Sequence, residues 1–148
     1  MTHHKLTPDV PGEIGDDTEL DRSVHPPRVL HLAYVIDNWL GDDLLEAYPA
    51  FMVTDHLRGL LEGSGLSGYE IRQADVTIEE EARDTLPMIG RTEFPEFLWL
   101  HVTGKPGHDD FGLTAKGDLV VSDRALEVLR QGHIDRCDID EYDQSTGA

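Results

Sequence analysis

The chain has 148 residues, of which 39% are hydrophobic and 28% are charged. This size and balance are typical of one globular domain with its own core, and no apolar run approaches the roughly 20 residues that cross a bilayer, so we expect no membrane insertion. Twelve Lys and Arg against 30 Asp and Glu give a net charge of −18, which argues against direct binding of nucleic acid. The acidity favours either a basic protein partner or plain solubility.

The N-terminal sequence and the cysteine content indicate the cellular compartment. The stretch MTHHKLTPDVPGEIGDD has no apolar central region of the kind that a secretory signal requires. Cys137 is the single cysteine, so it cannot form an internal disulfide or a thiolate zinc site. We therefore expect a cytoplasmic protein.

Residues 1–27 are rich in proline, glycine and acids and poor in large apolar side chains. Such a segment buries too little surface to offset the entropy of ordering, so we predict a mostly disordered acidic arm. The last residues are small and polar, and we predict a flexible tail at 143–148. A single α+β domain is expected over 28–142.

Within this domain, strand formers gather in three places. The segment RVLHLAYVI at 28–36 alternates apolar residues and predicts a strand, as do GYEIRQADVTI at 68–78 and PEFLWLHV at 95–102. The stretch 38–49 is interrupted by Gly41 and Pro49 and predicts a connection. The glycine-rich segment 103–117 is long for a plain loop, a feature that functional loops often share.

One phrase occurs twice, as AFMVTDHLRGLLEGSG at 50–65 and as DLVVSDRALEVLRQG at 118–132. Each copy predicts a short strand, an N-cap hydroxyl at Thr54 or Ser122, a helix with one apolar face, and a glycine stop. At an offset of 68 the identical pairs are Val53 and Val121, Asp55 and Asp123, Leu61 and Leu129, and Ile71 and Ile139. Internal duplication and convergence on a common capped unit both explain the match.

These elements predict an α+β fold. We expect two helices packed on one mixed, largely antiparallel sheet of five to seven strands, with an internal strand–helix–strand duplication as an option.

The sequence contains no complete catalytic, cofactor-binding or metal-binding motif. GSGLSG at 63–68 fits the dinucleotide pattern by letters, but it follows a helix and precedes a strand, which is the wrong order for binding phosphate. Ser122 is better explained as a helix cap than as a nucleophile, and Cys137 as a small buried residue. The histidines lack metal-binding spacing, and the nearest approach is His108 with the two aspartates that follow it. We therefore predict no catalytic residue, no metal and no cofactor.

The C-terminal part resembles a known group of proteins. The segments PEFLWLHVTGKPGHDDFGL and LVVSDRALEVLRQGHIDRCDIDEY, within about 95–142, are similar to those of a poorly characterised bacterial family akin to the immunity proteins of polymorphic toxin systems. The shared motifs are a cap and a helix face, so no functional residue carries over. The resemblance implies a non-enzymatic cytoplasmic protein that binds and neutralises a toxin.

The first functional hypothesis is an acidic binding module, immunity- or inhibitor-like, that occludes a basic protein partner. Aromatic anchors beside charges are typical of protein interfaces, and two irregular segments offer them. The candidate partner-binding residues are Trp39, Asp42, Asp43, His108, Asp109, Asp110 and Phe111. A core role for the aromatic residues is the competing interpretation. The alternative function is an enzyme or small-ligand-binding protein with a pocket around the 103–117 loop.

Overall fold

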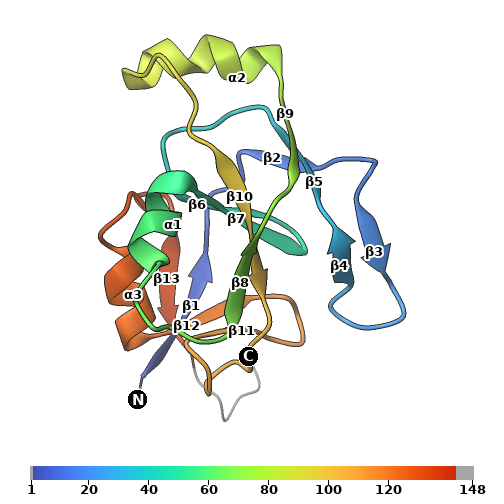
Figure 1. The fold of residues 1–148 in the computed structure, drawn as a ribbon, viewed down its shortest axis with the longest axis vertical. Helices are drawn as coiled ribbons and strands as arrows, with labels where there is room; N and C mark the ends of the chain where they lie inside the picture. Colours follow the sequence, from blue (N-terminus) through green and yellow to red (C-terminus); the bar gives the residue numbers. More distant parts are fainter. Residues whose placement is uncertain (1, 143–148) are drawn as a thin grey trace.

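The computed structural model describes residues 2–142, in which strands dominate (Figure 1). The strands are β1 (His3–Thr7), β2 (Gly12–Ile14), β3 (Glu19–Asp21), β4 (Arg28–His31), β5 (Ala33–Ile36), β6 (Leu44–Ala47), β7 (Ala50–Thr54), β8 (Tyr69–Arg72), β9 (Asp75–Ile78), β10 (Phe97–Val102), β11 (Phe111–Leu113), β12 (Leu119–Ser122) and β13 (Asp138–Glu141). The helices are α1 (Asp55–Leu61), α2 (Glu80–Thr85), the 3-10 helix η1 (Leu86–Ile89) and α3 (Asp123–Leu129). The flexible tail predicted at 143–148 lies outside the described residues.

The strands form four small sheets. Sheet A has the order β11-β12-β1-β13, sheet B β6-β7-β10-β8 and sheet C β2-β5-β9, and β3 pairs with β4 as a hairpin. The expectation of two helices on one sheet of five to seven strands is therefore wrong. It failed because strands of only three or four residues, such as β6 and β11, lie in segments that their glycines and aspartates mark as connections.

The N-terminal segment is a second correction. Residues 1–27 were predicted to be a disordered arm, yet they contribute β1, β2 and β3, and the side chain of Leu6 is buried. In β1, Leu6 lies opposite Leu119 on one side and Ile139 on the other. The composition of residues 1–27 does not reveal this structure, because the strands that hydrogen-bond to the β1 backbone lie more than a hundred residues away in the sequence.

The two helix starts that the repeated sequence pattern predicts, after Thr54 and after Ser122, are confirmed. The hydroxyl of Thr54 accepts a hydrogen bond from the backbone N–H of Leu57 at the start of α1, and that of Ser122 accepts one from Ala125 at the start of α3. Each helix follows a buried strand and leads through a loop to a further strand, β8 or β13. The local chemistry of capping therefore sets both helix boundaries.

In each strand–helix–strand unit, the two strands are separated by a strand from elsewhere in the chain. In sheet B, β10 lies between β7 and β8, and in sheet A, β1 lies between β12 and β13. The registers match, because Leu100 of β10 faces Phe51 and Ile71 as Leu6 of β1 faces Leu119 and Ile139. In each sheet, the strand between the two strands of the unit thus comes from outside that unit.

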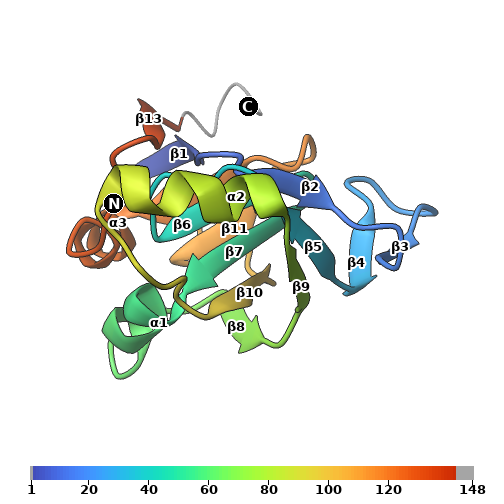
Figure 2. The same cartoon turned by 90° about the horizontal axis from the view of Figure 1, so that it is seen from above.

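Sheet B separates two cores. Every residue of β7 is buried, and its side chains alternate between a core shared with sheet A, α1 and α3 and a core shared with sheet C and α2. Phe51 and Val53 belong to the first core, whereas Met52 belongs to the second. Figure 1 shows α1 beside α3, the β3–β4 hairpin projecting on the opposite side, and α2 at one end of the molecule. Figure 2 looks down from that end, where α2 crosses over the strands.

Candidate functional site

The first predicted partner-binding segment is buried. Trp39, Asp42 and Asp43 expose 0%, 1% and 2% of their surface. The indole Nε1 of Trp39 donates to the backbone oxygen of Asp42 at 2.7 Å, and the ring packs edge-on against Phe97. The interface hypothesis needed these groups on the surface, so that premise is wrong. The core role of Trp39 fits instead.

Asp43 links the two strand–helix–strand units. Its carboxylate accepts hydrogen bonds from the Thr54 hydroxyl at 2.6 Å, the His133 backbone N–H at 2.8 Å and the His56 Nδ1 at 2.9 Å. Burial raises the pKa of Asp43, but these hydrogen bonds outweigh burial and hold the pKa below its usual value. The carboxylate is therefore an ionised link between the cap of α1 and the loop after α3.

Asp110 likewise links the cap of α3 to the loop after α1. Its carboxylate accepts from the Ser122 hydroxyl at 2.6 Å, from Arg124 Nη2 at 2.7 Å and from the Ser67 backbone N–H at 2.9 Å. The Arg124 guanidinium and these further donors hold the pKa of Asp110 well below its usual range. Ser67 follows α1, so each aspartate binds its own cap and the loop after the other helix.

The other predicted residues of the second segment, His108, Asp109 and Phe111, differ in their exposure. Phe111 is fully buried and packs against Tyr69, with ring centroids 5.0 Å apart. The Asp109 carboxylate accepts the Lys105 backbone N–H at 2.7 Å and so shapes the loop. Of the seven predicted residues, only His108 is exposed. Most of the predicted residues of the two acidic segments are buried. They do not form one exposed surface.

An apolar pocket of about 350 Å³ lies between the β3–β4 hairpin and sheet B. Its lining comes from the start of the hairpin strand β4, the β6–β7 turn, β10 and β11. The residues are Pro26, Pro27, Arg28, Val29, Pro49, Ala50, Phe51, Trp99, Leu100, His101, Val102, Thr103 and Leu113. Thr103 and Leu113 belong to the 103–117 segment, the region in which the alternative hypothesis expected a pocket.

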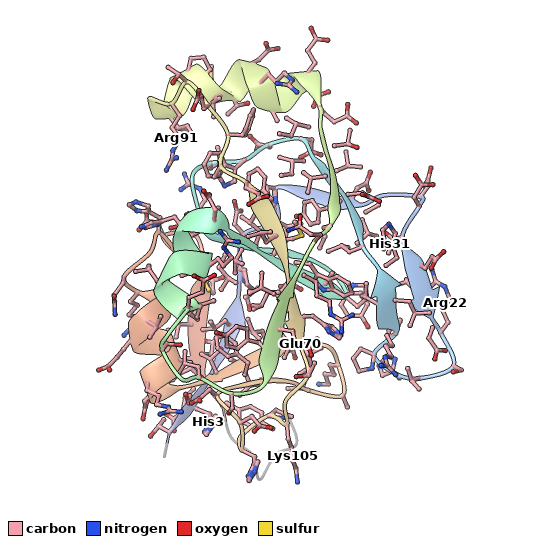
Figure 3. The ribbon with its side chains drawn as sticks, in the orientation of Figure 1. His3, Arg22, His31, Glu70, Arg91 and Lys105 are labelled. Carbon is pink, nitrogen blue, oxygen red and sulfur yellow. The ribbon has the colours of Figure 1, made fainter. Side chains whose placement is uncertain are left out.

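The ionisable side chains of this apolar pocket are His101 and Arg28. The His101 ring packs on Trp99 with centroids 4.8 Å apart, and its Nδ1 lies 3.5 Å from the Glu70 carboxylate. Burial lowers the pKa of His101, which favours the neutral ring. Arg28 is the other ionisable residue of the lining, which contains no Asp or Glu. Figure 3 labels Glu70 on β8, where it also pairs with Arg72 at 2.7 Å.

A second, polar pocket of about 620 Å³ opens beside α1. It is lined by Asp43, Asp55, His56, His133 and the segment 90–95. Arg91 of that segment lies between α2 and α1 in Figure 3, with its guanidinium carbon 4.8 Å from the centre of the Trp39 ring. The two pockets share no lining residue.

Comparison with known proteins identifies no relative. No protein-family model, no curated protein and no solved structure matches this chain. The resemblance to immunity proteins therefore stays a prediction.

Two further structural features are absent from residues 2–142. None of the helices there is long and apolar enough to cross a membrane. The same part of the chain holds no cluster of three or more His, Cys, Asp or Glu residues suited to a metal ion.

The sequence predicted a pocket only in the alternative hypothesis, around the 103–117 loop, and it did not predict the polar pocket. The apolar pocket is built largely from three prolines and a strand that are distant in the sequence, and outside 103–117 its local signal is the Pro26-Pro27 pair ahead of a strand. A difference between the two copies of the repeat could have pointed to the polar pocket. At the offset of 68, His56 falls on Arg124, so the two copies differ in charge beside equivalent helix caps.

Proposed function

We propose that the protein binds a small, largely apolar ligand carrying one anionic or hydrogen-bond-accepting group. The observation that carries this proposal is the apolar pocket of about 350 Å³, whose lining offers Arg28 and His101 but no carboxylate. In a chain with a net charge of −18, a concave site free of acids is a local exception. Apolar concavities with a few convergent polar groups are the usual form of a ligand site.

The lining defines the chemistry of the ligand. Pro26, Pro27, Trp99 and Leu113 give rigid or aromatic walls that suit an aromatic ring or a short aliphatic chain. Arg28 supplies a guanidinium for a carboxylate, and a neutral His101 supplies a hydrogen bond without a full charge. A small hydrophobic carboxylate combines both features.

Calorimetric titration with matched ligands tests the proposal. Phenylacetate and octanoate would be compared with their primary amides, which keep the apolar part and lose the charge. We expect the carboxylates to bind more tightly. Arg28→Gln should weaken carboxylate binding about tenfold and leave amide binding unchanged, because only the carboxylate uses the guanidinium charge.

Arg22→Gln is the matched control, since Arg22 is exposed on the same hairpin but does not line the pocket (Figure 3). It removes the same charge and should not alter binding. Failure of every ligand to bind the unmodified protein, or equal effects of the two substitutions, would contradict the proposal.

Binding of a basic protein is a second candidate, supported by a different surface from the one first predicted. Helix α2 and the residue before it expose Glu79, Glu80, Glu81 and Asp84, and the neighbouring Met88 exposes 84% of its surface. A carboxylate row beside an exposed apolar side chain suits a basic partner with an apolar anchor point. The triple substitution E80Q/E81Q/D84N should slow association with a basic partner, and added salt should do the same. Insensitivity to both changes would contradict this candidate.

A further inference from the structure

His56 and Arg124 occupy equivalent positions but contact their aspartates differently. Each is the second residue of its helix and follows an N-cap hydroxyl. Arg124 engages both oxygens of Asp110, with Nε at 3.0 Å from Oδ1 and Nη2 at 2.7 Å from Oδ2. His56 offers Asp43 only Nδ1. Within residues 2–142, the other ring nitrogen, Nε2, makes no hydrogen bond, and the His56 side chain lines the polar pocket.

The His56–Asp43 pair differs from the other histidine–carboxylate pairs of the described chain. The Asp43 side chain is 3% exposed, whereas the carboxylates that pair with His4, His31 and His101 are 56%, 75% and 52% exposed. Asp43 is also held by Thr54 and by the His133 backbone, so its position is fixed. A fixed buried carboxylate sets the orientation of an imidazole and directs its second nitrogen outward.

The groups around His56 define the substrate. The His133 ring lies 6.0 Å from the His56 ring between centroids, and Arg91 provides the one full positive charge of the lining. Asp43, Asp55 and Glu93 provide three carboxylates, so anionic substrates are disfavoured and neutral substrates are not. Besides the two imidazoles, these are the titratable groups that face the pocket.

We propose that this polar pocket is a hydrolytic site for neutral carboxylic esters, with His56 as the general base and Asp43 as a positioning residue. Nε2 of neutral His56 takes a proton from a water molecule while the water oxygen bonds to the ester carbonyl carbon. Arg91 stabilises the negative charge that develops on the carbonyl oxygen. The bond to the alkoxy oxygen then breaks, and the leaving alcohol takes the proton from the His56 imidazolium. The products are a carboxylic acid and an alcohol.

Ester hydrolysis by the whole chain tests the proposal, with p-nitrophenyl acetate and phenyl acetate as neutral probes. His56→Ala should lower kcat/KM by about 100-fold or more, the usual contribution of a positioned base. The rate of the unmodified protein should fall at acidic pH, because a general base must be unprotonated. Asp43→Asn should lower kcat and leave KM within about twofold, since the carboxylate orients the imidazole but does not contact the substrate.

Exposed imidazoles hydrolyse activated esters without a site, so His31→Ala is the matched control. His31 is also a partly exposed histidine paired with an aspartate, at 2.8 Å, and it lies outside both pockets (Figure 3). It should keep the rate within about twofold, well short of what loss of a positioned base would cost. Circular dichroism would verify that each variant is folded, and His56 is exposed enough for its replacement to be tolerated.

Three outcomes would overturn the proposal. The first is no hydrolysis above the protein-free rate, and the second is an equal loss in His56→Ala and His31→Ala. The third is activity that a chelator abolishes and zinc restores, because a metal would then activate the water. None of these outcomes affects the ligand-binding proposal, since the two pockets have no residue in common.

Discussion

Ser122→Ala removes a hydroxyl that serves two partners at once. The Ser122 oxygen accepts the Ala125 N–H at 3.2 Å as the cap of α3, and the hydroxyl donates to the buried Asp110 carboxylate at 2.6 Å. Loss of a cap costs about 1 kcal/mol, and loss of a hydrogen bond to a charged group costs about 1.5–3 kcal/mol. Asp110 keeps Arg124 and Ser67, so we expect the free energy of unfolding to fall by about 2–4 kcal/mol.

Urea denaturation followed by circular dichroism measures this loss, and a double-mutant cycle with Asp110→Asn separates the two contributions. Ser23→Ala is the control, because Ser23 makes a similar hydrogen bond to Asp21 on the surface and should cost less than about 0.5 kcal/mol. If Ser122→Ala costs no more than Ser23→Ala, or if the two cycle mutations are additive, the buried Ser122–Asp110 link has no energetic role.

Three further predictions concern other parts of the fold. Burial and the nearby Asp118 raise the pKa of Glu46 to about 7. The protein therefore loses stability as the pH rises from the pKa that Glu46 has in the unfolded chain to its pKa in the folded protein. Glu46→Gln should therefore match the unmodified protein at pH 4 and exceed it in melting temperature at pH 8, and equal values at pH 8 would refute the burial argument. Deletion of residues 1–10 should abolish cooperative thermal unfolding, because β1 is an inner strand of sheet A; a disordered arm would be dispensable. Burial raises the pKa of Cys137 to about 12, so its reaction with iodoacetamide at pH 8 should be much slower than in urea, and equal rates would show an accessible thiol.

The features predicted correctly from sequence are local. Thr54 and Ser122 are confirmed as caps because a cap, the first helical turn and the apolar face lie within a dozen residues. The strand expected over 95–102 is present as β10 for the same reason. Each of these elements carries its own stabilising pattern in consecutive side chains.

The features that were missed depend on residues far apart in the chain. Asp43 is buried because it binds Thr54, 11 positions away, and His133, 90 positions away. In isolation, an aspartate among glycines and acids is typical of a solvated turn. β1 was missed in the same way, since its partners Leu119 and Ile139 lie in the last third of the chain. No local pattern distinguishes such a strand from a polar tail.

The wide separation in sequence of the strands of sheet A sets an order for folding during synthesis. All four strands of sheet B have been synthesised once Val102 has been added, whereas sheet A needs β13, which ends at Glu141. β1 has neither neighbour until β12 (Leu119–Ser122) has been made, and it has only one until β13 follows. Sheet A is therefore complete only after β13 has been made, and a chain that ends between 102 and 137 contains all of sheet B but lacks a strand of sheet A.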